Sequence, residues 1–359
     1  MVTWAYAAIL AWSFALPAPV VPVTPTVLPM PRPEQVMAVP PGLRAQLQQQ
    51  VMDAGGSRRA RLDRLMDFLF QQSGLNMQYD ADATLTVEQA YRLRKANCLT
   101  FTLLTVALAH EAGLDAHGQE FDDVVAWRVG GDVVYRFNHV NAGVVIGGSR
   151  YTVDVARDVV VTRDSPRPIS DQRLLALYYN NRAAELIARA LPAAAAPYMT
   201  MALQLAPRYA SGWANAGVLQ LQQGDPRAAE RDYLKALAIA PEHAGALFNL
   251  VTLYRRNGDE ARLASYQRRL DKVQLTDPYF QYLRAMDDEA RGNYDDAVRH
   301  YRRAIRLYDG DSRFYLGLAR AYRQLGKERR AQRAMHQASA LGRTGANGMS
   351  RIRPSSSRE

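Results

Sequence analysis

Apolar residues in segment 42–75 recur every three or four positions, a spacing typical of amphipathic helices. Gly55 and Gly56 interrupt this pattern, and paired glycines favour a turn, so the segment predicts two helices. The positions that carry the pattern are Leu43, Leu47, Val51, Leu62, Leu65, Met66 and Leu69. Residues 86–95 predict another short helix.

A longer helix is predicted over residues 97–113, which are apolar on nearly every side. Such a helix belongs in a core, and Gly113 is a natural C-terminal stop. Residues 132–146 and 149–156 are rich in Val and Tyr, and Gly147-Gly148 between them is a hairpin signal. Helices followed by antiparallel strands predict an α+β domain over residues 42–172.

Four glycines in the second half of the chain stand 34 residues apart: Gly224, Gly258, Gly292 and Gly326. Each lies between two helical patterns. A 34-residue helix–turn–helix period resembles the tetratricopeptide repeat (TPR), which predicts about five units over residues 176–343 and an all-α superhelix.

The clearest repeat spans residues 210–243. It carries small or aromatic residues at the family positions, namely Trp213, Gly217, Gly224, Ala229, Tyr233, Ala236 and Pro241. Units 244–277 and 278–311 lack the Trp and the closing Pro. The small residues indicate close helix approach, which larger side chains would prevent.

Asn181, Asn215 and Asn249 also stand 34 residues apart, on the first helix of three successive units. In the TPR family this position often carries an Asn that bonds the ligand backbone. An Asn side chain offers both a donor and an acceptor, as a peptide bond requires. The resemblance therefore predicts a protein or peptide partner held by these three residues; the alternative is that they only fill polar surface.

The two ends of the chain carry different signals. Residues 1–15 form a short apolar stretch in which Ser13 and Ala15 fit the small-residue cleavage rule, so they predict a signal peptide and a periplasmic or secreted protein. The stretch is too short to span a membrane, and a disordered cytoplasmic tail is the alternative. Residues 16–41 predict a Pro-rich extended linker, and residues 344–359 a disordered basic tail.

Charge and cysteine content narrow the function classes. The formal charge of +10 favours acidic partners or anionic surfaces, although solvated arginine-rich helices give the same balance. Nucleic-acid binding is the least favoured function, because export would nearly exclude it. The single cysteine excludes an intramolecular disulfide and a cysteine-based zinc site. With no Gly-rich phosphate loop either, we expect no metal, nucleotide or flavin cofactor.

That cysteine, Cys98, stands at the start of the predicted buried helix, where unpaired N–H groups and the helix dipole stabilise a thiolate. A packing role is the alternative. A thiol nucleophile needs a base, and His139 is the only histidine on a predicted strand beside the hairpin. His110 lies at the far end of the helix and His117 in the loop after it. Asp154 shares a face with His139 in either of two hairpin registers, with position 141 or position 139 opposite it.

Segment 92–156 resembles the core of the transglutaminase-like (papain-related) superfamily. The likeness rests on Asn97-Cys98-Leu99-Thr100-Phe101, Asn138-His139-Val140-Asn141 and Tyr151-Thr152-Val153-Asp154-Val155. It implies an α+β papain-like domain with a Cys98–His139–Asp154 triad.

The reaction implied by this resemblance is acyl transfer through a thioester, ending in hydrolysis or cross-linking of protein or peptide amides. The TPR units would then recruit the substrate. Papain relatives carry a Gln six residues before the cysteine, and Arg92 stands there. The alternative is therefore a non-catalytic TPR scaffold with a retired transglutaminase-like domain.

Overall fold

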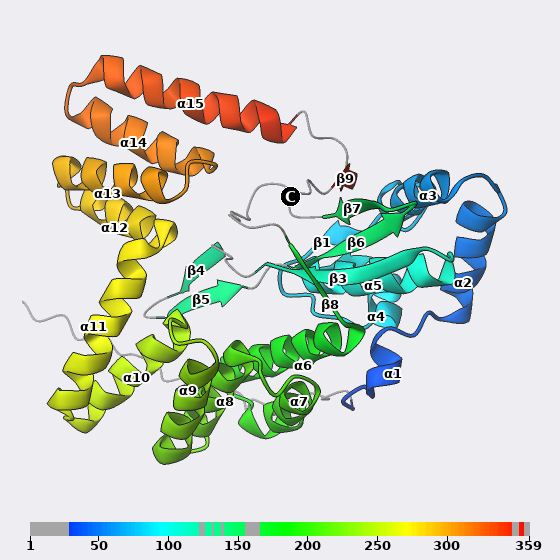
Figure 1. Ribbon diagram of the computed structural model, residues 1–359, viewed down its shortest axis with the longest axis horizontal. Coiled ribbons are helices and arrows are strands. Elements are labelled where there is room, and N and C mark those ends of the chain that lie inside the picture. Colours follow the sequence, from blue (N-terminus) through cyan, green and yellow to red (C-terminus); the bar gives the residue numbers. More distant parts are fainter. Residues whose placement is uncertain are drawn as a thin grey trace, which may run out of the picture. The chain divides into compact units, whose positions relative to one another are not determined.

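The computed structural model describes residues 29–121, 126–130, 133–137, 140–154, 166–346 and 352–354. The chain divides into two units, residues 1–30 and 31–359. All the helices and strands described here belong to the second unit (Figure 1).

The predicted N-terminal helices are present. They are α2 (Pro41–Leu47), which continues into a π-helical turn (Gln48–Met52), α3 (Arg58–Phe70), α4 (Val87–Leu93) and α5 (Cys98–Glu111). Gly55 and Gly56 have positive φ angles of 63° and 86°, which explains why the chain turns there. Gly113, with φ +66°, follows the end of α5 as predicted.

The prediction of an extended linker over residues 16–41 is wrong for the C-terminal part of this segment. Helix α1 (Pro33–Val36) lies within it, and Val36 and Val39 are buried. The Tyr179 hydroxyl donates to the Pro31 carbonyl at 2.7 Å. Proline is compatible with a first helical turn, so the Pro-rich composition did not prevent this segment from packing.

An antiparallel five-stranded sheet has the order β8-β3-β6-β7-β9. Its strands are β3 (Asp115–Glu120), β6 (Val140–Ile146), β7 (Ser149–Val153), β8 (Arg167–Ile169) and β9 (Ile352–Pro354). Two short ladders stand apart from it. They are β1 (Gln78–Tyr79) with β2 (Lys95–Ala96), and β4 (Ala126–Gly130) with β5 (Val133–Phe137).

Three predictions about the sheet and the C-terminal tail need correction. The single strand predicted over 132–146 is described as β5 and β6, which belong to different ladders. His117, predicted in a loop, lies on β3, where pairing with β6 and β8 on both sides overrides a polar sequence. Part of the tail predicted as disordered is ordered, because β9 pairs with the otherwise open edge of β7.

The central sheet has an apolar and a polar face, since side chains alternate along a strand. Its buried apolar residues are Ala116, Val140, Ala142, Val144 and Val153. Helix α5 contacts both β3 and β6 and is buried from Leu99 to Ala109, so it covers the apolar face. The opposite face carries His117, Gln119, Asn141, Thr152 and Asp154.

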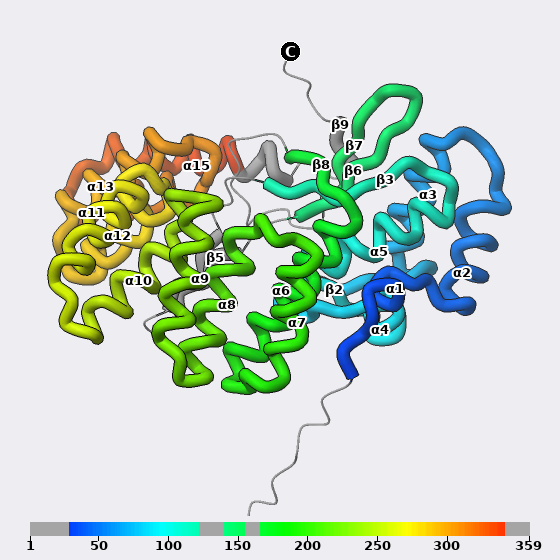
Figure 2. The backbone as a smooth tube through the Cα atoms, turned by 60° about the horizontal axis from the view of Figure 1, so that its bottom comes forward, coloured from blue at the N-terminus to red at the C-terminus, as the bar shows by residue number. Residues whose placement is uncertain are grey.

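Ten further helices form five antiparallel pairs (Figures 1 and 2). The pairs are α6 (Asp171–Ala188) with α7 (Pro192–Leu205), α8 (Ala210–Gln222) with α9 (Pro226–Ile239), α10 (Ala244–Asn257) with α11 (Glu260–Thr276), α12 (Pro278–Ala290) with α13 (Tyr294–Leu307), and α14 (Ser312–Gln324) with α15 (Glu328–Ala346). The four in-phase glycines all have positive φ, between 66° and 85°, and stand at the turns within pairs. This conformation, which L side chains rarely adopt, explains their period.

Close helix contact also requires glycine inside a helix. A Cβ on Gly217 of α8 would lie 2.4 Å from the Tyr233 ring of α9, so any side chain would push the pair apart. Buried residues of α8–α11 form one core cluster, and those of α12–α15 form others.

The third and fourth pairs are joined differently from their neighbours. Only Asp277 separates α11 from α12, and it ends one helix while capping the next. Leu275 stands where Pro207 and Pro241 follow α7 and α9, so nothing stops α11 from continuing. Helix α11 has 17 residues, against 14 in α9.

Candidate functional site

Cys98 is the first residue of α5, and its surface is partly exposed. Asn97 caps the helix, since its Oδ1 accepts a hydrogen bond from the Thr100 N–H at 2.8 Å. The cap holds the first turn, and with it the thiol, at the helix N-terminus. The predicted position of Cys98 at the start of the helix is therefore confirmed, and its role as a nucleophile stays a prediction.

The start of β6 lies next to this end of α5. The Thr102 hydroxyl, one turn after Cys98, is 2.8 Å from the Cys98 carbonyl oxygen and 3.3 Å from that of Val140. Thr102 therefore ties the thiol-bearing turn to the residue that follows position 139. His139 itself lies outside the described residues, so its predicted role as the base stays a prediction.

Asp154 takes the first of the two predicted registers. Ile146 pairs with Ser149 across Gly147-Gly148, and Ala142 pairs with Val153, which sets position 141 opposite Asp154. There the Asn141 Nδ2–H donates to Asp154 Oδ2 at 3.1 Å. Sequence reasoning missed this contact, although its own register placed the two residues opposite each other.

Asn141 is only 2% exposed, and none of the residues that the structure describes provides a hydrogen-bond partner for its Oδ1. Because α5 covers the apolar face of the sheet, this amide and Asp154 lie on the other face. The structure places Asp154 opposite Asn141 near the start of β6, on the face of the sheet away from α5 and Cys98.

Asn181, Asn215 and Asn249 are half-buried on α6, α8 and α10. Asn215 Nδ2 donates to Asn180 Oδ1 at 2.9 Å, which links the first two helix pairs. Asn180 is a buried polar residue, 4% exposed, next to Asn181 on α6, and the repeat pattern did not predict its contact with Asn215. Within the described part of the chain, no group donates a hydrogen bond to Oδ1 of Asn215.

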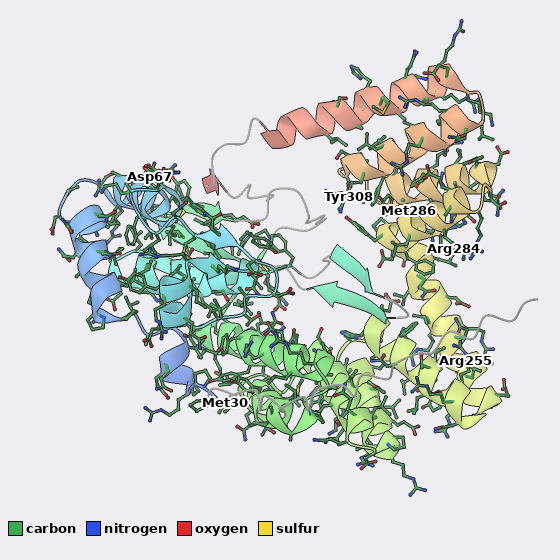
Figure 3. The ribbon with its side chains drawn as sticks, turned by 180° about the vertical axis from the view of Figure 1, so that it is seen from behind. Met30, Asp67, Arg255, Arg284, Met286 and Tyr308 are labelled. Atoms are coloured by element: carbon green, nitrogen blue, oxygen red, sulfur yellow. The ribbon has the colours of Figure 1, made fainter. Side chains whose placement is uncertain are left out.

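Large apolar side chains are exposed on the first helices of the later pairs. Phe248 is 38% exposed, Met286 42% and Leu316 37%. Phe248 and Leu316 stand 68 residues apart, which is two repeat periods, so they occupy the same position on α10 and α14. Met286 lies on α12 with the exposed Arg284 (Figure 3).

We also searched the described residues for a cavity, a metal site and a membrane-spanning helix. A cavity of about 520 Å³ lies among β8, α6 and the α7–α8 connection, and none of the predicted site residues lines it. Among the described side chains, no group of three His, Cys, Asp or Glu residues could hold a metal ion. None of the helices in the described ranges combines the length and apolar character needed to cross a membrane.

Two tetratricopeptide repeat families match parts of the chain, one over residues 210–243 and the other over residues 289–346. The first match coincides with the unit predicted as the clearest repeat. The C-terminal half therefore contains TPR repeats, as predicted. No curated protein matches the sequence.

Similar solved structures come from TPR-type proteins. A crystal structure of MamA is 16% identical, covers 46% of this chain and 96% of its own, and has a TM-score of 0.28. MamA from Desulfovibrio magneticus RS-1 is 15% identical, with 47% and 96% coverage and a TM-score of 0.27. YrrB, described as a TPR protein with an unusual peptide-binding site, is 18% identical, with 46% and 86% coverage and a TM-score of 0.26.

Proposed function

We propose that this chain is a protein-interaction scaffold whose TPR repeats bind an extended segment of a protein partner. The observation that carries this proposal is the common phase of Asn181, Asn215 and Asn249 on the first helices of three successive pairs. Helix pairs stacked at a constant period repeat the same side-chain position at regular intervals. A peptide backbone offers hydrogen-bonding groups at regular intervals too.

Asn215 has a defined part in this proposal. Since Asn215 gives an Nδ2 hydrogen to Asn180, its Oδ1 is the group offered to a peptide N–H. Phe248 and Leu316, partly exposed at one shared position, would take apolar side chains of the same peptide. Such a mixed polar and apolar surface selects peptides by side chain while binding their backbone.

The test selects peptides from a random phage-displayed library on the wild-type protein and measures their affinity by fluorescence anisotropy. Each hydrogen bond is worth on the order of 1 kcal/mol, so Asn215→Ala/Asn249→Ala should weaken binding about ten- to thirtyfold. The control is Asn293→Ala, because Asn293 is exposed in a turn and its side chain caps no helix. Equal affinity of the double variant and wild type, with intact circular dichroism, would mean that the asparagines only fill surface.

A second candidate function is thiol-dependent acyl transfer, favoured by the accessible Cys98 on a capped helix end beside the start of β6. The Cys98 thiolate would attack an amide carbonyl carbon, forming a C–S bond. The C–N bond then breaks while His139 gives its proton to the leaving amine. Water or a second amine finally attacks the thioester, which yields hydrolysis or cross-linking and regenerates the thiol. Asp154 would orient His139.

Iodoacetamide alkylation across pH, followed by intact mass, tests this second function. A thiol activated by a histidine base is alkylated faster at pH 6 to 7 than the same thiol in the urea-unfolded chain. The His139→Ala variant should lose this difference in alkylation rate. The matched control is His336→Ala, since His336 is exposed on α15. Alkylation that is identical in wild type and His139→Ala across pH would remove the enzyme reading and leave the scaffold.

We propose that the protein is exported, and the support for this is the apolar sequence of residues 1–15. In its native host the mature chain should begin near Leu16, in the periplasm or outside the cell. N-terminal sequencing of the protein purified from that host tests this. An intact Met1 or Val2 would rule it out.

A further inference from the structure

The second helices of the last four pairs share one phase. Helices α9, α11, α13 and α15 begin at Pro226, Glu260, Tyr294 and Glu328, which stand 34 residues apart (Figure 1). The sixth, ninth, tenth and thirteenth positions of such a helix lie on one face, because residues three and four apart are neighbours on a helix surface. The four helices therefore carry sixteen equivalent positions on this face.

Positive charge is concentrated at these sixteen positions. Ten of them are Arg or Lys and none is Asp or Glu, whereas the whole chain has 45 Lys and Arg against 35 Asp and Glu. Nine of the ten side chains are exposed, and the tenth is half-buried. We call these ten residues the basic face: Arg231 and Lys235 on α9, Arg268, Arg269 and Lys272 on α11, Arg299, Arg302, Arg303 and Arg306 on α13, and Arg333 on α15.

Local structural roles account for few of these charges. Arg299 pairs with Asp296 at 2.5 Å, and Lys235 with Asp232 at 3.4 Å. The helix dipole favours a cation in the last turn of a helix, but in α13 only Arg306 stands there. Among the described residues, no carboxylate lies within ion-pair distance of seven of the ten, which are Arg231, Arg268, Arg269, Arg302, Arg303, Arg306 and Arg333.

Helix α13 carries the densest part of the basic face. Arg302, Arg303 and Arg306 lie within about one helical turn of each other. Helices α13 and α15 both contact α14, so Arg333 on α15 belongs to the same group of helices. Eight of the ten cations are Arg, whose planar guanidinium binds a carboxylate or a phosphate through two parallel hydrogen bonds. The basic face is therefore suited to an extended anionic ligand.

The uncharged positions of this face indicate which kind of anion fits. None of the sixteen positions carries Phe, Trp or Tyr, so the bases of a single-stranded nucleic acid find no ring to stack on. Helices that bind a membrane surface add large apolar side chains that enter the acyl region. Leu234 on α9 is the only large apolar residue among the sixteen, and α13 and α15 have none. Carboxylates of a protein are the anions that this composition favours.

We propose that the basic face of α13 and α15 is a docking surface for an acidic segment of a partner protein. The Asp and Glu side chains of that segment would bind the guanidinium groups of Arg302, Arg303, Arg306 and Arg333. This surface is separate from the proposed peptide groove, whose asparagines lie on the first helices of the first three pairs. The scaffold would then hold two partners, one by its backbone and one by its charge.

The test measures the binding of fluorescein-labelled poly-L-glutamate to the full chain by fluorescence anisotropy, at low and at physiological salt. Arg302→Gln/Arg303→Gln/Arg306→Gln should bind about three- to thirtyfold more weakly than wild type, and the difference should shrink as salt screens the charges. Arg58→Gln/Arg189→Gln/Arg208→Gln is the matched control. It removes the same charge at three exposed sites outside the last four pairs, and should bind nearly like wild type.

Equal losses in the two Gln variants would mean that net charge alone attracts the probe, which would overturn the docking surface. Arg302→Lys/Arg303→Lys/Arg306→Lys keeps the charge and should recover most of the affinity. A Lys variant as weak as its Gln counterpart would overturn the proposal too, because the loss would then come from a disturbed helix.

Two more probes test the kind of partner. Phosphatidylglycerol vesicles and poly-thymidylate, at matched charge concentration, should bind wild type more weakly than poly-L-glutamate does. Tighter binding of either would assign the basic face to a membrane or to nucleic acid instead. The peptide selected for the groove should bind the α13 Gln variant like wild type. Loss of that peptide would reveal one shared surface and overturn the second one, whereas failure of the asparagine test leaves the poly-L-glutamate comparison unaffected.

Discussion

Asn141 and Asp154 face each other across the β6–β7 hairpin, and the Asn141 amide donates to the carboxylate at 3.1 Å. The pair is set by the two-residue turn, because Gly147 and Gly148 both adopt positive φ, 58° and 81°, as a tight hairpin requires. A shift of one residue in this turn would separate them. The turn glycines thus determine where the proposed triad carboxylate stands.

Replacing Asn141 by Asp should destabilise the hairpin at neutral pH. The change sets two carboxylates opposite each other, and like charges at this range raise the pKa of one of them. The free energy of unfolding of Asn141→Asp should therefore be lower than that of wild type at pH 7, and the gap should narrow as the pH falls to about 4. Urea unfolding at both pH values measures this. Asn141→Ser, which adds no charge, should show a gap that does not change with pH.

Gly217→Ala should destabilise the second helix pair by about 1 to 3 kcal/mol, the usual result of overpacking. The new Cβ would lie 2.4 Å from the Tyr233 ring, so the ring or the helix must move. The control is Gly42→Ala in α2, where the nearest neighbour is the Tyr91 hydroxyl at an ordinary contact distance of 3.4 Å. That change should be neutral or slightly stabilising, because alanine favours a helix over glycine. Equal stability of the two variants, measured by urea unfolding, would contradict the packing argument.

The repeat architecture could be predicted from the sequence because each helix pair requires the same residue types at the same positions. Gly224 and Gly258 show this, since a left-handed turn needs glycine at a fixed period. The start of α5 could also be predicted, because Asn97 precedes an apolar run. Strand β3 could not be predicted from the sequence, because its polar residues become extended through pairing with β6 and β8. The Asn141 contact with Asp154 depends on the register of the hairpin, which no local sequence pattern encodes.

His300 should make the fourth helix pair sensitive to mild acid. Burial lowers its pKa most, Arg284 and Arg299 lower it further, and Asp288 and Asp296 oppose them. Its Nδ1–H donates to Gln281 Oε1 at 2.9 Å. Since the unfolded chain takes up the proton more readily, stability is full above about pH 6.5 and falls as the pH drops toward the folded-state pKa.

The measurement is thermal unfolding of wild type and His300→Gln between pH 8 and 5. Wild type should lose more stability over this range than the variant, which has no proton to bind at this position. His336→Gln on α15 serves as the control and should follow wild type. An identical pH profile for wild type and His300→Gln would show that burial of this ring does not govern acid stability.

The last prediction concerns Leu275, which stands where other units carry proline. Leu275→Pro would complete the repeat pattern, so a reading from sequence alone predicts a neutral or stabilising change. In the structure residue 275 lies inside α11, and a proline there removes a helical hydrogen bond and clashes with the preceding turn. We therefore expect a loss of about 1 to 3 kcal/mol in urea unfolding. Leu275→Ala is the control, because the side chain is 45% exposed and its truncation should cost little. A Leu275→Pro variant as stable as Leu275→Ala would mean that α11 ends before residue 275 and that Asp277 does not join α11 directly to α12.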